Sequence, residues 1–218
     1  FNSAYCVMAT GCLSAANDPE FAGKGSFTGD WYHTGRWPHE GADFSGLRVG
    51  VVGTGSTAIQ AIPIIAEQAA HLTVFQRTPN FSVPAWNRIT DPEEEQEWKE
   101  NLSALREKVR WSNSGTNTVG NLRLAAEMTP EELEHELETR WHGGSFSMLG
   151  AFSDLMTDDD ANAIATEFVH NKIRERVTNP EMAELLCPKE HPFGTKRLCV
   201  DSHYYETYNR KNVTLVDI

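Results

Sequence analysis

Cysteine is scarce in this chain, and the sequence has neither a long apolar run nor an excess of positive charge. The four cysteines among 218 residues form no C-x-x-C pair, which argues against a metal site or a disulfide framework and favours reduced thiols in the cytoplasm. No apolar run is long enough to span a bilayer, and we expect no signal peptide. The formal net charge of −12 argues against nucleic acid or a membrane surface as the main partner.

The chain also lacks an initiating methionine and begins at Phe1. Residues 4–11 have the small and apolar composition of a buried strand that ends in glycine. Residues 212–218, at the other end, have the pattern of a strand as well. Since natural proteins seldom begin and end so close to strands, we expect the chain to be an internal piece of a longer protein.

Residues 47–60 carry the most specific signal, and they predict a short buried strand, a tight glycine turn and the start of a helix. Gly53 permits the unusual dihedral angles of the turn, and Gly55 lets a pyrophosphate approach the backbone. Ala58 stands at the third position of the G-x-G-x-x-G/A pattern, and the helix start favours negative charge. The predicted dinucleotide-binding residues of this stretch are Gly53, Thr54, Gly55, Ser56, Thr57, Ala58 and Gln60.

A second strand is predicted at residues 71–75, which completes a βαβ unit. Domains selective for NAD usually carry Asp or Glu at the end of this strand to bind the ribose 2′-hydroxyl. Here Arg77 and Thr78 follow the strand instead, and Lys196 is a candidate second cation. Because cations and a hydroxyl suit a 2′-phosphate, we predict NADP(H) as the ligand. The alternative is a doubly wound domain that binds no dinucleotide.

From residue 91 onward the pattern becomes helical, with Asp, Thr and Asp at predicted N-caps and proline in the first turn of two helices. One further helix is expected over residues 146–156. We therefore predict an α/β fold with a Rossmann-like parallel nucleotide-binding sheet, flanked by helices and interrupted by a mostly helical insertion. The expected divisions are a linker strand and loop (1–46), the first part of the nucleotide domain (47–90), the insertion (91–187) and the return to the nucleotide domain (188–218).

An aromatic segment precedes the glycine turn, and by composition alone it is best interpreted as a loop packed against the sheet. Five of its residues match the pattern Phe-x-Gly-x-x-x-His-x-x-x-Trp-Pro: Phe27, Gly29, His33, Trp37 and Pro38. This pattern resembles the fingerprint of the flavin-dependent (class B, type I) Baeyer–Villiger monooxygenases. The similarity continues through residues 53–56, 75–79 and 192–197 and looks nearest to the phenylacetone and steroid monooxygenase branch.

The resemblance implies an enzyme that uses NADPH, FAD and O2 to convert a ketone into an ester or lactone. NADPH would reduce FAD, and a flavin peroxide would attack the ketone. The family places an arginine over the flavin, where it stabilises negative charge, and Arg197 matches it. Only one glycine motif is present, so the FAD site would lie mostly in another domain of the same longer polypeptide. We expect no metal, and we expect this chain alone to be inactive.

The sequence leaves other classes of protein as alternatives. Another class B flavin monooxygenase, of the N-hydroxylating or flavin-containing type, would share the same plan of two nucleotide domains. A non-catalytic NADP-binding module is a second alternative. A short-chain reductase is disfavoured, because no Tyr-x-x-x-Lys spacing occurs in the sequence.

Overall fold

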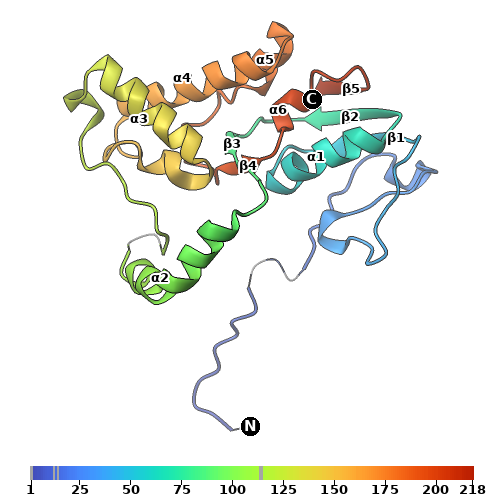
Figure 1. Cartoon of the computed structure of the whole chain (residues 1–218). Coiled ribbons are helices and arrows are strands. Elements are labelled where there is room, and N and C mark those ends of the chain that lie inside the picture. The colour runs from blue at the N-terminus through green and yellow to red at the C-terminus, as the bar shows by residue number, and fades with distance from the viewer. Residues whose placement is uncertain (1, 12, 14, 113–114) are drawn as a thin grey trace. The chain divides into compact units, whose positions relative to one another are not determined.

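The computed structural model describes residues 2–11, 13, 15–112 and 115–218 (Figure 1). The chain divides into two compact units, residues 1–43 and residues 44–218. The larger unit holds both sheets and all the α-helices of the described residues, so it contains the predicted nucleotide fold.

The central sheet of the larger unit is parallel, with the strand order β1-β2-β5. Its strands are β1 (Arg48–Val52), β2 (His71–Gln76) and β5 (Val213–Asp217). Alternate residues of β2 are buried, as expected for a strand rich in apolar residues between two neighbours. The predicted α/β class with parallel strands flanked by helices is confirmed.

Helix α1 (Ser56–Gln68) connects β1 to β2 and supplies much of the core. It buries Ile59, Ile62, Ile65 and Ala66, at the three- to four-residue spacing of one helix face. The short helix α6 (Tyr204–Thr207) packs against α1, and its first two tyrosines are almost completely buried. Burying this face holds the start of α1 at the carboxyl end of β1.

A second, two-stranded parallel sheet pairs β3 (Ser82–Pro84) with β4 (Cys199–Asp201). Its strands lie on opposite sides of the helical segment in the sequence, so the pairing closes the chain around that segment. The Ser82 hydroxyl donates to Asp201 at 2.8 Å. Because Asp201 is buried, this bond and the nearby Arg176 guanidinium, 3.3 Å away, compensate its charge.

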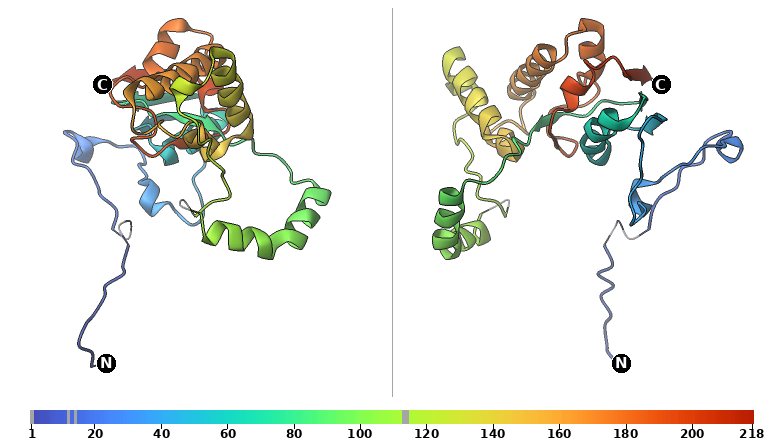
Figure 2. Two further views of the ribbon diagram at one scale, coloured as in Figure 1. Left: turned by 90° about the vertical axis from the view of Figure 1, so that its left-hand side faces the viewer. Right: turned by 45° about the vertical axis from the view of Figure 1, so that its right-hand side comes forward.

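The helical segment contains four α-helices: α2 (Pro92–Arg110), α3 (Pro130–Gly143), α4 (Asp159–Arg176) and α5 (Pro180–Leu186). Side-chain N-caps begin all four. Helices α3 and α4, drawn in Figures 1 and 2, are joined by an ion pair between Lys172 and Glu138 at 2.5 Å. The helical segment also contains two 3-10 turns, η3 (Ala125–Glu127) and η4 (Ser145–Gly150).

The helix expected over residues 146–156 is wrong in extent. Only the 3-10 turn η4 forms, and it ends at Gly150. The Gly150 carbonyl accepts the Asn121 N–H at 2.8 Å, and the Ser153 N–H donates to the Arg123 carbonyl at 3.0 Å. Because these backbone groups bond to Asn121 and Arg123, they are not available for the hydrogen bonds of an α-helix over residues 146–156.

The strand expected over residues 4–11 is also wrong, because the structure has no strand there. Tyr5 and Val7 are 90% and 88% exposed. An extended segment becomes a strand only when a neighbour takes its backbone hydrogen bonds, and within residues 2–11 those bonds are local, such as Ala9 N–H to the Val7 carbonyl. The smaller unit contains only the short turns η1 (Lys24–Ser26) and η2 (Thr34–Arg36) as regular elements among its described residues.

Among the residues that the structure describes, three cysteines are free thiols, and no group of acidic, histidine or cysteine side chains could hold a metal ion. The fourth, Cys12, lies outside the described residues. None of the helices in those ranges combines the length and the apolar character needed to cross a membrane.

Candidate functional site

The glycine turn lies between the end of β1 and the start of α1, at the carboxyl edge of the central sheet, where open α/β folds bind their ligands. Gly53 has a φ of +97°, which a side chain would strain, and its N–H donates to the Phe75 carbonyl of β2 at 2.8 Å. Gly55 has an ordinary extended backbone, but a Cβ placed there would meet nothing within 4 Å. Its missing side chain therefore leaves open space beside the backbone.

The start of α1 leaves N–H groups open. Gly55 is the N-cap and provides no side-chain cap, so the first N–H groups of the helix can bind an anion and the helix dipole favours it. The Ser56 hydroxyl lies near the buried Cys199 thiol of β4, which donates to the Arg197 carbonyl at 3.8 Å. Burial raises the pKa of that thiol, and the nearby Ser56 hydroxyl opposes part of the rise. The open turn and uncapped helix start fit a diphosphate group.

Two side-chain bonds hold the turn against the segment after β2. Thr54 is only 4% exposed, and its hydroxyl donates to the Thr78 carbonyl at 2.9 Å. The Asn80 amide donates to the Thr54 carbonyl at 2.7 Å. The structure thus brings the predicted residues Thr54 and Thr78 together. Asn80 was not predicted as a site residue. The only signal for it in the sequence was its place two residues after Thr78.

The predicted cations lie at the surface. Arg77, Lys196 and Arg197 are exposed, and in the described ranges none has a side-chain hydrogen bond or an ion pair. No described contact joins Arg77 to Lys196, so the structure does not bring the proposed 2′-phosphate pair together directly. Thr57 and Gln60 are exposed on α1, and Ala58 is half-buried there.

A histidine and a glutamate from the segment before β4 lie near these groups. The Thr78 hydroxyl contacts the Glu190 carboxylate at 3.4 Å. His191 is half-buried, and neither of its ring nitrogens has a hydrogen-bond partner among the described residues. Burial and the nearby Lys196 lower the pKa of His191, and Glu190 opposes this. The sequence did not predict Glu190 or His191 as site residues, because Glu190 reaches Thr78 across more than a hundred residues of sequence.

The fingerprint residues belong to the smaller unit. His33 caps η2, because its Nδ1 accepts the Gly35 N–H at 3.0 Å, while its Nε2 faces the Asn17 carbonyl at 3.0 Å. Phe27 and Trp37 are 64% and 41% exposed. Pro38 is half-buried, and Gly29 is exposed. The histidine therefore organises its own loop, and the aromatic rings remain at the surface of this unit.

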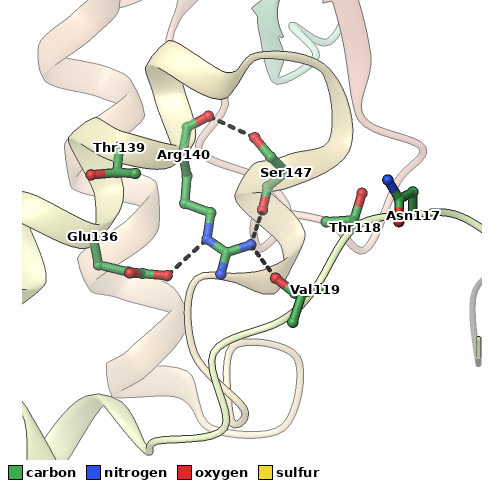
Figure 3. A pocket seen from close by; sticks show the side chains of 7 residues that line it. All are labelled: Asn117, Thr118, Val119, Glu136, Thr139, Arg140 and Ser147. Atoms are coloured by element: carbon green, nitrogen blue, oxygen red, sulfur yellow. Dashed lines mark hydrogen bonds and ion pairs between the residues drawn. The ribbon is translucent and has the colours of Figure 1, made fainter. Parts of the chain in front are cut away.

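The helical segment also contains a separate hollow of about 480 Å3. Figure 3 shows the side chains that line it. Arg140 extends across it from α3 and donates to Glu136 at 2.8 Å, to the Val119 carbonyl at 2.9 Å and to the Ser147 carbonyl at 3.1 Å. These bonds tie the segment after α2 to α3 and η4. None of the predicted site residues lines the hollow.

The glycine turn and the parallel sheet have the geometry of a Rossmann-like α/β unit. Comparison with known proteins shows which proteins share it. No family model matches the chain. A Baeyer–Villiger monooxygenase of Pseudooceanicola batsensis is 41% identical over 216 residues, covering 98% of this chain and 39% of that protein. A phenazine N-monooxygenase of Lysobacter antibioticus is 40% identical over 220 residues, covering 100% of this chain and 40% of that protein.

The structural comparison agrees. The solved structure of an oxidised steroid monooxygenase bound to NADP matches with a TM-score of 0.91 and 50% identity, over 94% of this chain and 39% of that one. The predicted resemblance is confirmed: the homologues of this chain include Baeyer–Villiger monooxygenases, among them a cyclohexanone 1,2-monooxygenase of Acinetobacter. The chain spans about two fifths of the length of the curated relatives that it matches.

Proposed function

We propose that this chain is the NADP(H)-binding portion of a flavoprotein monooxygenase that performs a Baeyer–Villiger oxidation. The reaction would consume a ketone, O2, NADPH and a proton, and would give an ester or lactone, NADP+ and water. One observation carries the proposal: the open glycine turn at the carboxyl end of β1 adjoins an α1 start without a side-chain cap. The NADP-bound steroid monooxygenase that resembles this chain supports the same ligand.

The turn from Gly53 to Ser56 would hold the pyrophosphate on backbone N–H groups, with Thr57, Ala58 and Gln60 on the first turns of α1 beside it. Thr54 would keep the turn in register through its bond to the Thr78 carbonyl. At the end of β2, Arg77 and the Thr78 hydroxyl would bind the 2′-phosphate, and Lys196 would supply a second cation. The unpaired state of both cations in the described ranges leaves their charge available to a ligand.

FAD, when bound, would supply the electron transfer and the activation of oxygen. Its site would lie mostly outside this chain, in a flavin domain of the same polypeptide. Arg197 would extend toward it and present a fixed positive charge to the anion that forms in the reaction, since guanidinium stays protonated and donates in a rigid fork. The fingerprint loop of Phe27–Pro38, the domain divisions predicted above and a cytoplasmic location remain predictions.

A second candidate function is N-oxidation by a class B flavin monooxygenase. The phenazine N-monooxygenase supports it, because that relative is as similar to this chain as the Baeyer–Villiger enzyme of Pseudooceanicola. The NADP(H) site would be the same in both cases. The glycine turn does not select between a ketone and a nitrogen heterocycle. Assays of both substrate classes, with a chain extended to the length of the relatives, would therefore decide between the two functions.

Calorimetric titration with NADPH and NADH tests the nucleotide assignment. We expect the chain to prefer NADPH, and Arg77→Ala and Lys196→Ala each to weaken NADPH binding by about tenfold, or about 1.4 kcal/mol, with little effect on NADH. Arg48→Ala is the matched control, because Arg48 is an exposed cation at the opposite end of β1. Equal affinity for both nucleotides in the unaltered chain would contradict the proposal.

The chain by itself is expected to lack ketone oxidation, because the residues described here form one nucleotide site only. Purified chain, NADPH, FAD and cyclohexanone can be combined and assayed for ester or lactone by chromatography. Turnover without any added polypeptide would refute the assignment of the flavin site to another domain.

A further inference from the structure

The segment after β2 lacks the acid that NAD-selective domains carry in sequence, but the fold places one there from a distant segment. The Glu190 carboxylate lies 3.4 Å from the Thr78 hydroxyl. Thr78 itself is fixed beside the glycine turn, because its carbonyl accepts the Thr54 hydroxyl at 2.9 Å. The acid therefore lies beside the segment that follows β2, and dinucleotide-binding folds read the 2′ substituent of the adenine ribose at the end of this strand.

Two polar side chains near Glu190, those of His191 and Lys196, have no hydrogen-bond partner among the described residues. His191 follows Glu190 with two buried ring nitrogens, and its ring packs edge-on against Phe81 at 5.4 Å between centroids. Lys196 is close enough to influence His191 electrostatically. No ion pair joins Glu190 to a cation in the described part of the chain. The carboxylate thus remains free to act on a ligand bound at Thr78.

We propose that Glu190 sets how strongly the site distinguishes NADP(H) from NAD(H). Its carboxylate repels the 2′-phosphate of NADP(H), and it can accept a hydrogen bond from the 2′-hydroxyl of NAD(H). This inference rests on the proposed dinucleotide function. Arg77, Lys196 and the Thr78 hydroxyl favour the phosphate, and Glu190 opposes them. Glu190 therefore limits the preference of the chain for NADP(H) over NAD(H).

The test is calorimetric titration of the unaltered chain and Glu190→Gln with NADPH and with NADH. The amide has nearly the same shape as the carboxylate but carries no charge, so it removes the repulsion and weakens the bond to the 2′-hydroxyl. We expect the NADPH dissociation constant to fall about fivefold and that for NADH to rise at least twofold, which together shift the selectivity ratio about tenfold. Glu134→Gln, an exposed α3 acid, is the charge-matched control.

A second variant separates this role from a purely structural one. Thr78→Val keeps the charge of Glu190 but removes its contact with the hydroxyl. If Glu190 acts through its charge, Thr78→Val weakens NADPH binding, opposite in sign to Glu190→Gln. If Glu190 only positions Thr78, both variants change NADPH binding in the same direction, and the proposal is overturned.

The remaining outcomes are also decisive. The proposal for Glu190 is overturned if the selectivity ratio changes less than twofold in Glu190→Gln, or if it changes equally in Glu134→Gln. In either case the proposed function still stands, provided that the unaltered chain prefers NADPH. Failure of the unaltered chain to bind NADPH overturns both. A rise in selectivity that is confined to Glu190→Gln and opposite to Thr78→Val supports the proposal.

Discussion

Asn80 and Thr54 are joined by a hydrogen bond of 2.7 Å from the side-chain amide of the former to the main-chain carbonyl of the latter. This bond fixes the second residue of the glycine turn from outside the turn. At the other end of α1, the amide of Asn212 donates to the carbonyls of Ala66 and Ala69 at 2.9 and 3.0 Å. Two asparagines thus hold the two ends of the same helix, and only one lies at the proposed site.

This symmetry gives a matched pair of variants. We expect Asn80→Ala to reduce the free energy of unfolding by about 1 kcal/mol and to raise the NADPH dissociation constant about fivefold, because the turn loses its fixed position. Asn212→Ala should reduce stability by about 1–2 kcal/mol but leave NADPH affinity within about twofold. Urea unfolding and calorimetry measure both quantities. Equal loss of NADPH affinity in the two variants would contradict a local role for Asn80.

Acid stability is expected to depend on Glu132. Two hydrogen bonds of 3.0 Å from Arg123, together with the Thr129 N–H, lower the pKa of its carboxyl from 4.5 to about 2. Since the folded chain binds this proton less tightly than the unfolded chain, the stabilisation is present above pH 4.5 and is lost as the pH falls toward 2. In Glu132→Gln the decline of stability over this range should be shallower.

Urea midpoints measured between pH 2 and pH 7 test this dependence. Glu131→Gln is the control, because the described residues offer Glu131 no ion pair although it lies on the same helical turn. An unchanged acid profile in Glu132→Gln would show that the Arg123 pair contributes no stability in solution.

Gly144 is expected to tolerate no side chain. Its φ of 66° and ψ of −174° belong to a region that only glycine occupies readily. A Cβ would also lie 2.7 Å from the Trp86 ring and 2.9 Å from the Pro84 carbonyl. Gly144→Ala should cost about 2–3 kcal/mol of stability. At Gly143 a Cβ has ordinary contacts, 3.4 Å at the closest, so Gly143→Ala should remain within about 1 kcal/mol. Thermal unfolding separates the two.

Two arginines near the end of α4 should differ greatly in their contributions to stability. Arg176 compensates the buried Asp201 carboxylate at 3.3 Å and binds Glu206 at 2.6 Å. Arg176→Leu leaves Asp201, whose pKa burial already raises, without its cation, and should cost about 3–5 kcal/mol. Arg174 is exposed and pairs with Glu184 at 2.7 Å and with Glu167 at 2.8 Å, so Arg174→Leu should cost at most about 1 kcal/mol. Similar losses in urea unfolding would contradict this difference.

The sequence predicted those parts of the fold whose causes are local. The βαβ unit follows from β-branched strand residues and the glycines of the turn, and the starts of α2, α3 and α4 follow from their caps. Where the outcome depends on a distant partner, local patterns were insufficient. Residues 4–11 have a strand's composition but no neighbouring strand, and the backbone near Gly150 bonds to residues 121–123 instead of continuing a helix.

The candidate site likewise contains residues that local sequence predicted and residues that it did not. The turn residues Gly53 to Ser56 were predicted from their spacing, and Thr54 and Thr78 lie together. Asn80 and Glu190 were not predicted, because their importance comes from contacts made when β3 and β4 pair and bring residue 190 to the end of β2. The roles of Arg77, Lys196 and Arg197 remain predictions that only ligand binding can test.

The most direct test of a dinucleotide site at the glycine turn is NADPH titration of Gly55→Ala. Because the Gly55 backbone is ordinary and a Cβ there meets nothing within 4 Å, we expect the variant to unfold within about 0.5 kcal/mol of the unaltered chain. The same methyl group would occupy the space assigned to the pyrophosphate, so NADPH affinity should fall at least about tenfold. A variant that is equally stable and binds NADPH as tightly as the unaltered chain would contradict the account.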